Sequence, residues 1–387
     1  MTNTNVRDSF PDILRGFALF GIALVNIPLL SIDTLLAFEG SDLTQPSNFA
    51  AAFIVMTFFQ AKFYIIFSFL FGYSAHYVIR GEKQNRGRWI GRSIGLIILG
   101  ILHFTFFFHG DILFLYGLFG LLLLALYFRS DKAIRGWATG LYIGITILYI
   151  ALGALTYVGE MLLTAKGKSL PGEMFTPALN EALKSGSFLD TVGPRVELWL
   201  FAAPNGILLQ GPLVFIAFLV GVLVARKNGL VSTNPKLLNK LILWGFLIGL
   251  PVQAFSAWLF LTNSIGADSI GIYLLSLFIN LLGAPLLSAG YVALLWKIAQ
   301  KAKLILLSSA GRMSLTIYLG ESVVAATIFS AWGFGLFAKL GVAEVVLIAA
   351  ATWFALALLS VIYFKFRNKG PMETVLTRFS KLFERKS

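Results

Sequence analysis

The residues best placed for chemistry are two histidines and an aspartate that share one apolar stretch of the chain. Residues 100–116 contain His103, His109 and Asp111, and their neighbours are mostly aliphatic or aromatic. A charged side chain in hydrocarbon costs about 2 to 3 kcal/mol, so such residues usually face the interior of a helix bundle or a wet cavity. This stretch is therefore the candidate catalytic site.

Local structural roles offer an alternative interpretation of the same residues. Gly110 and Asp111 together favour a hairpin, because glycine permits the turn and aspartate can cap the next helix. His109 is typical of a residue at the membrane interface, and His103 could make a structural hydrogen bond. The hairpin would place His103 roughly 9 to 12 Å below the turn, closer to one side of the membrane.

Three arginines near the ends of apolar stretches are candidates for binding the phosphates of a ligand, namely Arg15, Arg92 and Arg312. Arginine suits this role because its planar guanidinium can hold a phosphate through two hydrogen bonds. For Arg15 an interfacial location with Asp12 as counter-charge is an equal alternative.

Six further residues within apolar stretches are candidate substrate-binding residues: Asn26, Lys62, Tyr64, Tyr116, Tyr318 and Glu321. Ser314, Tyr318 and Glu321 follow spacings of four and three, so they share one helical face. Asn26 predicts a hydrogen bond between helices. Lys62 either extends its amine to the outer interface or faces inward, where it could pair with Asp111.

The composition is that of a polytopic membrane protein. Of the 387 residues, 58% are hydrophobic and 13% are charged, which lies far outside the range of soluble domains. The absence of cysteine excludes disulfides and thiolate chemistry, and with three histidines we expect no metal site. The net charge of +13 follows the positive-inside rule, so we expect no nucleic-acid partner.

About ten apolar stretches are long enough to cross a membrane, which predicts an all-α, polytopic helical membrane protein. They lie near residues 13–31, 50–79, 91–109, 111–128, 138–162, 199–225, 238–261, 270–298, 304–330 and 342–364. Lys and Arg concentrate in alternate loops, so we expect both termini in the cytoplasm.

We treat residues 1–387 as one integral membrane domain with two helical halves, 1–162 and 199–387, around an extracytoplasmic loop, 163–198. A short amphipathic helix near residues 177–189 in this loop could cover an outward cavity.

Five motifs, in order along most of the chain, resemble the YeiB-like family of bacterial integral membrane proteins, which carry a C-terminal domain of unknown function. They are Asp12-Ile-Leu-Arg-Gly16 continuing to Asn26, Lys62-Phe-Tyr64 continuing to Gly72, Leu102-His103 followed by Gly110-Asp-Ile-Leu113 and Tyr116, Gly311-Arg-Met-Ser-Leu315 continuing to Leu319, and Gly370-Pro-Met-Glu373.

The N-terminal half of this family is similar to the transmembrane acyltransferase superfamily, which includes the lysosomal enzyme that acetylates the terminal glucosamine of heparan sulfate. The resemblance implies a cytoplasmic acyl-CoA donor, an extracytoplasmic hydroxyl or amine acceptor, and a histidine working within the membrane. His103 matches the YeiB-like motif. Residues 31–48 contain no histidine, although the lysosomal relative carries its reactive histidine in the corresponding region.

We therefore expect transfer of an acetyl or other short acyl group from acetyl-CoA or a similar donor to a glycan or small-molecule acceptor. His103 would act as general base or carry the acyl group, Asp111 would orient it, and the three arginines would hold the donor phosphates. We expect the protein in the bacterial cytoplasmic membrane, where membrane lipid is a partner. A homodimer is also compatible with the sequence. The alternatives are a small-molecule transporter that uses buried Lys62, His103, Asp111 and Glu321, and a scaffold for other membrane proteins.

Overall fold

The computed structural model describes residues 9–33, 38, 41–166, 177–230, 234–266 and 269–384, and these form helices joined by short connections. The α-helices are α1 (Phe10–Leu29), α2 (Pro46–Phe58), α3 (Lys62–Ile79), α4 (Arg86–Phe106), α5 (Leu113–Tyr127), α6 (Asp131–Thr164), α7 (Pro177–Ser185), α8 (Val192–Asn205), α9 (Gly211–Arg226), α10 (Pro235–Trp244), α11 (Leu250–Gly266), α12 (Ile270–Ala299), α13 (Ile305–Arg312), α14 (Ser314–Phe329), α15 (Val342–Tyr363) and α16 (Pro371–Lys381). No strand occurs within these ranges, so the all-α prediction is confirmed.

Eight helical segments of the described chain are long and apolar enough to cross a membrane. The two shorter apolar helices, α5 and α14, coincide with two other expected spans. Single π-helical turns, at Gly206–Gln210 and Gly245–Gly249, join α8 to α9 and α10 to α11 into continuous spans. The amphipathic helix expected after residue 177 is α7; residues 167–176 lie outside the described part.

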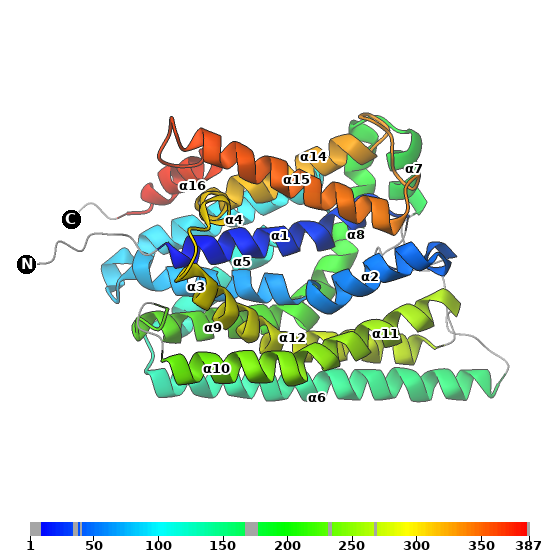
Figure 1. Ribbon diagram of the computed structural model, residues 1–387, viewed down its shortest axis with the longest axis horizontal. Helices are drawn as coiled ribbons and strands as arrows, with labels where there is room; N and C mark the ends of the chain where they lie inside the picture. The colour runs from blue at the N-terminus through cyan, green and yellow to red at the C-terminus, as the bar shows by residue number, and fades with distance from the viewer. Residues whose placement is uncertain are drawn as a thin grey trace, which may run out of the picture.

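Helix α1 runs through the bundle between two groups of helices. In Figure 1, α6, α9, α10 and α12 lie on one side of α1, and α14, α15 and α16 lie on the other. Helix α1 packs mainly on α13 and α15, while α3 packs on α9 and α4 on α5. The main core cluster includes side chains from α1, α3, α4, α5, α9 and α14, so the helices that carry the candidate residues share one packed interior.

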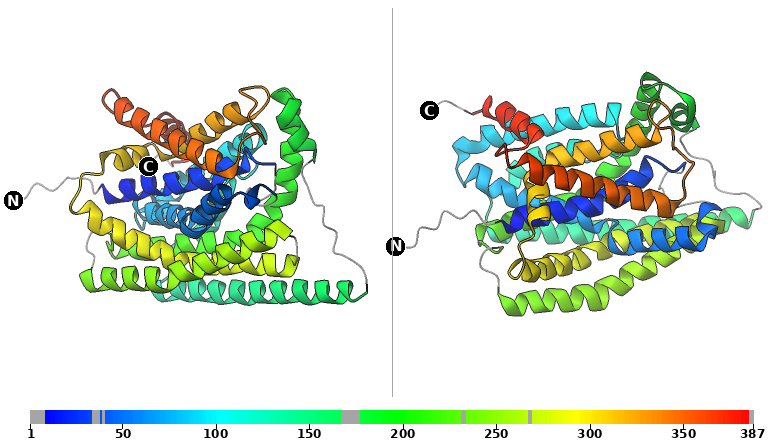
Figure 2. Two further views of the ribbon diagram at one scale, coloured as in Figure 1. Left: turned by 45° about the vertical axis from the view of Figure 1, so that its right-hand side comes forward. Right: turned by 45° about the horizontal axis from the view of Figure 1, so that its top comes forward.

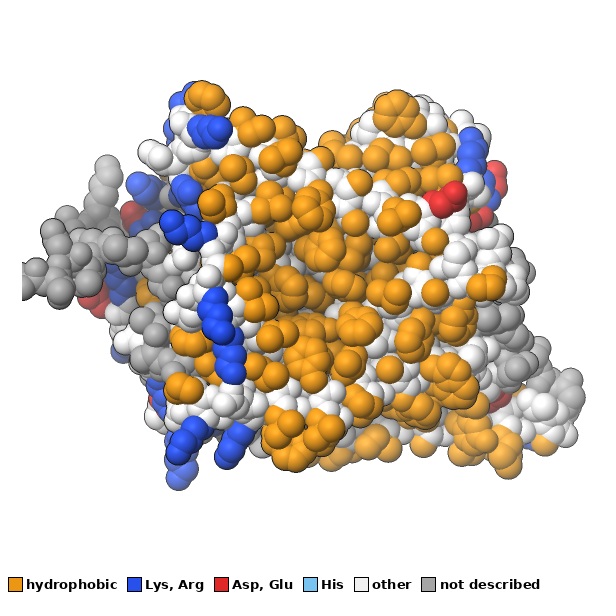
Figure 3. Space-filling view, in the orientation of Figure 1, with side chains coloured by type: hydrophobic (Ala, Val, Ile, Leu, Met, Phe, Trp, Pro, Cys, Tyr) orange, Lys and Arg blue, Asp and Glu red, His pale blue; other side chains and the backbone are white. Residues whose placement is uncertain are grey.

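The two ends of the bundle differ in charge. Helix α1 begins and α16 ends at the same end, where Lys and Arg side chains gather, and the surface between the two ends is largely hydrophobic (Figures 1 and 3). We call this end the basic face. Helices α7 and α8 lie at the opposite face, as the further views in Figure 2 show.

The second expected span is broken near its middle, between α2 and α3. Ala61 has a φ of +67°, and the N–H of Lys62 bonds the carbonyl of Gln60 at 2.9 Å, which forms a strained γ-turn. The break frees carbonyls of α2, and the buried Lys62 Nζ donates to the carbonyl of Met56 at 2.7 Å. Of the two alternatives for Lys62, the structure has the inward-facing one, but the expected pairing with Asp111 is wrong, because the amine donates to backbone inside the bundle.

Candidate functional site

His103 and Asp111 form a buried pair at the hairpin between α4 and α5. His103 Nδ1 lies 2.7 Å from Asp111 Oδ2, and the two side chains are 1% and 0% exposed. The other carboxylate oxygen accepts the N–H of Phe114 at 2.9 Å, so Asp111 also caps α5. Asp111 thus contacts His103 and caps α5 at the same time, so the capping role does not exclude the pairing.

The close approach of α4 and α5 depends on Gly100. A Cβ at this position would stand 2.4 Å from the backbone nitrogen of Phe114 and 2.7 Å from Asp111 Oδ1. Any larger residue would push the start of α5, and with it the carboxylate, away from His103.

The protonation pattern of the pair follows from the chemistry of its partners. A carboxylate only accepts hydrogen bonds, so we assign the hydrogen of the neutral imidazole to Nδ1 and the lone pair to Nε2. Nε2 is buried and has no hydrogen-bond partner among the described residues. The imidazole can therefore act at Nε2 as a base or a nucleophile.

Arg195, at the start of α8, holds the end of α4 that carries His103. Its guanidinium donates to the carbonyl of Phe106 at 2.9 Å and to the hydroxyl of Thr191 at 3.1 Å, and its side chain is buried. A cation at a helix C-terminus satisfies unpaired carbonyls and complements the helix dipole. His109 lies in the same turn, packs on Phe108, and has its pKa lowered to about 4 by burial and then by the charge of Arg195.

Two glycines bring the phosphate-binding candidates together at the basic face. A Cβ on Gly311 would stand 1.7 Å from the carbonyl oxygen of Asp12, and a Cβ on Gly16 would stand 2.0 Å from that of Leu307. This contact between α1 and α13 places Arg15 and Arg312 on one wall, although they are far apart in sequence. Arg15 keeps Asp12 as its partner, with Nη1 2.7 Å from Oδ1.

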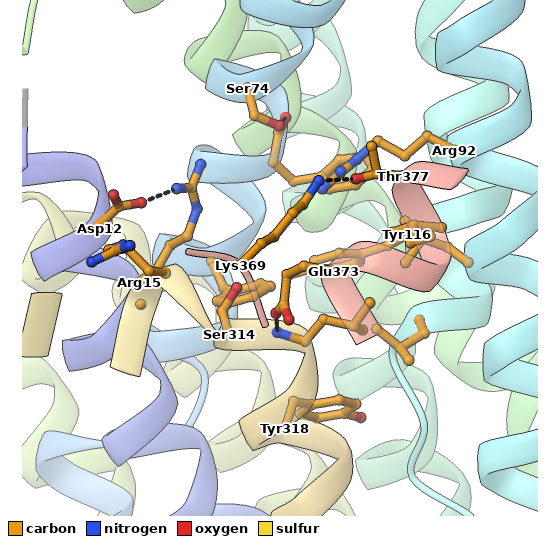
Figure 4. A pocket seen from close by; sticks show the side chains of 18 of the residues that line it. Asp12, Arg15, Ser74, Arg92, Tyr116, Ser314, Tyr318, Lys369, Glu373 and Thr377 are labelled. Atoms are coloured by element: carbon orange, nitrogen blue, oxygen red, sulfur yellow. Dashed lines mark hydrogen bonds and ion pairs between the residues drawn. The ribbon is translucent and has the colours of Figure 1, made fainter. Parts of the chain in front are cut away.

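A cavity of about 450 Å³ extends inward from this wall (Figure 4). Its lining residues come from α1, α3, α4, α5, α13, α14, α16 and the segment before α16: Asp12, Arg15, Ile22, Phe67, Phe71, Ser74, Val78, Arg92, Leu96, Ile112, Leu113, Tyr116, Gly311, Arg312, Ser314, Leu315, Tyr318, Asn368, Lys369, Glu373, Leu376 and Thr377. All three candidate arginines are among them.

The mouth of the cavity carries more positive than negative charge. Arg312 stacks on Phe364, 3.9 Å from the ring centroid, and Arg92 lies 5.7 Å over Phe71. Partial burial, followed by the charges of Arg92 and Arg88, lowers the pKa of Lys369 below its ordinary value, although Glu373 acts in the opposite direction. Such a cluster favours an anionic ligand.

Glu373 of α16 is not free to neutralise this mouth. Its Oε1 accepts the N–H groups of Leu315 and Thr316 at 2.7 and 3.2 Å, and its Oε2 accepts the Thr316 hydroxyl at 2.7 Å. The carboxylate thus caps the first turn of α14, which begins after the break at Met313. The expected single span 304–330 is divided at this break, and a C-terminal helix supplies the missing acceptor.

The deep end of the cavity reaches the residues that surround the His–Asp pair. The ring of Tyr318 lies 5.1 Å from that of His103, and its hydroxyl accepts the N–H of Ile112 at 3.3 Å. Tyr116 lies beside it, with its hydroxyl 2.7 Å from Ser68 Oγ. Tyr318, which contacts His103, and Ile112, which follows Asp111 in the chain, both line the cavity. His103 and Asp111 themselves do not line the cavity, but residues in contact with them or next to them do.

The remaining candidates do not line this cavity. Tyr64 contributes its carbonyl, which accepts the Tyr116 hydroxyl at 3.1 Å. Glu321 is buried, and one of its carboxylate oxygens has no partner among the described residues. Asn26 is only partly buried, and the expected bond between helices is not observed for it within the described ranges. His109, as described above, lies in the turn.

Sequence reasoning missed Lys369 as a cavity residue and Arg195 as a support of α4. Lys369 immediately precedes the Gly370-Pro-Met-Glu373 motif, and this position could have identified it as a candidate. Arg195 falls in the stretch that the sequence predicts as an extracytoplasmic loop, among other charged residues, and nothing local distinguishes it.

The fold and the cavity together define a polytopic helical membrane protein with a buried His–Asp pair behind a basic mouth. The profile of the family described as "Protein of unknown function (DUF418)" matches residues 224–382. The chain is 29% identical to the uncharacterized protein YxaH of Bacillus subtilis, over 96% of this chain and 94% of that protein. It is 27% identical to the uncharacterized protein YeiB of Escherichia coli, over 94% and 93% of the two chains. Over nearly its whole length the chain is thus similar to YeiB and its relatives, and its C-terminal part matches the profile of that family of unknown function.

A third relative, an uncharacterized 39.9 kDa protein of Bacillus acidopullulyticus, is 38% identical over 30% of this chain and 33% of its own length. No solved structure gives a significant match.

Proposed function

We propose that this protein is a transmembrane acyltransferase that moves an acetyl or other short acyl group from cytoplasmic acyl-CoA to an extracytoplasmic hydroxyl or amine. The supporting observation is the cavity that begins among Arg15, Arg92 and Arg312 and ends at the residues around His103 and Asp111. A basic mouth suits the phosphates of coenzyme A, and an interior of about 450 Å³ with many apolar side chains in its wall suits its pantetheine arm.

The length of the cavity wall agrees with this assignment. Arg92 and His103 lie on the same helix, eleven residues apart, which corresponds to about 16 Å. This separation is comparable to that between the phosphates and the sulfur of an extended coenzyme A. A donor held at the arginines would thus bring its thioester close to Tyr318 and the His–Asp pair.

Two chemical routes use the lone pair on His103 Nε2. In the covalent route, Nε2 attacks the thioester carbonyl carbon, the carbon–sulfur bond breaks, and the thiolate leaves and takes up a proton. The acceptor then attacks the carbonyl carbon of the acyl-imidazole, the carbon–nitrogen bond breaks, and neutral His103 is restored; the proton that the acceptor loses balances the one that the thiolate takes up, so none is gained or lost overall. In the direct route, Nε2 takes the proton of the acceptor while the acceptor attacks the thioester carbonyl carbon; the carbon–sulfur bond then breaks, and the imidazolium gives that proton to the leaving thiolate. In both, Asp111 stabilises the cation that forms on the imidazole.

Tyr318 is suited to assist at the carbonyl oxygen. Its hydroxyl accepts a hydrogen bond from Ile112, so its own hydrogen remains available to a carbonyl or oxyanion in the cavity. Tyr116 uses its hydroxyl on Ser68 and the backbone of Tyr64, and it therefore shapes the wall.

An isotope-exchange assay tests the proposal without a known acceptor. Purified protein is incubated with acetyl-CoA and labelled coenzyme A, and transfer of label into acetyl-CoA reports reversible formation of an acyl-enzyme. We expect exchange by the wild type and a loss of about 10²- to 10⁴-fold in His103→Gln. The matched control is His76→Gln, which changes a histidine that bonds Tyr127 away from this cavity.

The outcomes separate the two routes and the proposal itself. The direct route is supported if no exchange occurs but coenzyme A thiol is released when a membrane-glycan fraction is added. That release must also depend on His103. Thiol release that is unchanged in both His103→Gln and Asp111→Asn shows that these residues do not perform the chemistry.

A transporter is the second candidate, because two spans are interrupted and ionisable residues are buried near them. The breaks lie between α2 and α3 and between α13 and α14, and Lys62 and Glu321 are buried. Broken helices often form the substrate sites of transporters. Proton flux into proteoliposomes that falls in Glu321→Gln but not in His103→Gln would favour this function.

A further inference from the structure

A second hollow lies beside the mouth of the cavity, where the end of α15 meets α16. It is an open groove of about 540 Å³ whose cationic lining residues are Arg367, Lys369 and Arg378; we call it the arginine groove. Asn368 and Lys369 line both the groove and the cavity, so the two spaces are contiguous at these residues.

The charges around the two spaces do not balance. Six cationic side chains line them, against two carboxylates: Arg15, Arg92, Arg312, Arg367, Lys369 and Arg378, against Asp12 and Glu373. Asp12 bonds Arg15, and Glu373 caps α14. Within the described residues, Arg367 and Arg378 have no acidic partner.

The residue types favour phosphate as the missing anion. Two guanidiniums and an ammonium face one groove, and arginine binds phosphate oxygens through paired hydrogen bonds. The position of Lys369 between the groove and the cavity means that one ligand can contact both spaces.

We propose that the arginine groove binds a terminal phosphate of the ligand whose narrow arm occupies the cavity, so that the preferred donor carries phosphates in two separate groups. The inference rests on the proposed donor function and adds a substrate preference to it. Coenzyme A, with a diphosphate and a separate ribose phosphate, has this chemistry. Dephospho-coenzyme A, which lacks the ribose phosphate, does not. A phospholipid headgroup in the inner leaflet is the other possible source of a phosphate.

Calorimetry on the full chain in detergent compares these two probes. We expect the wild type to bind coenzyme A about tenfold more tightly than dephospho-coenzyme A, as the loss of one or two charge-assisted hydrogen bonds implies. The double variant Arg367→Gln, Arg378→Gln should bind both probes equally, with its affinity for dephospho-coenzyme A unchanged. The matched control is Arg135→Gln, an exposed arginine on α6, which should keep the preference.

The other outcomes overturn the inference in distinguishable ways. Equal binding of both probes by the wild type excludes a phosphate site in the groove but leaves the donor function intact. Binding of neither probe by folded protein removes the donor function as well. A lipid headgroup is tested in nanodiscs, where the melting temperature is compared between phosphatidylglycerol and phosphatidylcholine. If phosphatidylglycerol stabilises the wild type but not the double variant, and the wild type does not distinguish the two soluble probes, the groove binds a lipid headgroup instead.

Discussion

Replacing Gly311 with alanine should separate the two helices that form the basic wall of the cavity. The added Cβ would stand 1.7 Å from the carbonyl oxygen of Asp12, whereas ordinary contact begins at 3.4 Å, so α1 and α13 must move apart by about 1.7 Å. The nearest atom is backbone, which cannot rotate away. Overpacking of this kind costs about 1 to 3 kcal/mol, and we expect the upper end of that range.

The same displacement should weaken donor binding, because Arg15 and Arg312 lie on the two helices that separate. Thermal unfolding in detergent measures the stability, and calorimetry with coenzyme A measures the affinity, which should fall at least tenfold. Gly140→Ala on α6 is the matched control, because nothing lies within 4 Å of its Cβ position and alanine favours the helix by up to about 1 kcal/mol. If Gly311→Ala were as stable as Gly140→Ala and bound coenzyme A normally, the close contact between α1 and α13 would be refuted.

Three further predictions concern the hairpin that carries the pair. Asp111→Asn should retain the cap on Phe114 but lose the charged acceptor of His103. Isotope exchange should therefore fall at least 10²-fold, while the melting temperature changes little. Exchange equal to that of the wild type would contradict the role of the carboxylate. Arg195→Gln should cost about 1.5 to 3 kcal/mol in unfolding free energy by freeing the carbonyl of Phe106, and Arg195→Lys should recover part of this loss. His109 has a folded pKa near 4, below its unfolded value near 6.5, so protonation favours the unfolded state and stability should fall as pH drops from 6.5 to 4. Melting curves of His109→Gln should show a smaller loss over that range, and an identical loss would show that other groups cause it.

The sequence allowed prediction of features that depend on local pattern. Span lengths follow from runs of apolar residues, and the pairing of His103 with Asp111 follows from a turn of glycine and aspartate eight residues downstream. The cluster of Arg15, Arg92 and Arg312 was predictable as a common location near one membrane face. Its actual closeness depends on Gly16 and Gly311, whose contacts form only in the folded chain.

The features that could not be predicted depend on which backbone groups tertiary structure leaves unpaired. The break between α2 and α3 exposes the carbonyl of Met56, and this explains why the Lys62 amine turns inward. The break at Met313 exposes the first N–H groups of α14, and Glu373 reaches them from 57 and 58 residues away in sequence. A hydropathy pattern contains neither break, because both lie inside stretches apolar enough on average to be taken as single spans, 50–79 and 304–330.

The bond from Glu373 to α14 has a consequence for the order in which the protein becomes competent during synthesis. The first turn of α14 lacks its acceptor until residue 373 has been made and α16 has docked beneath it. Seven of the helices that line or adjoin the cavity are inserted before this occurs. The wall of the cavity to which Glu373 and α16 contribute is therefore completed only as one of the last steps of folding.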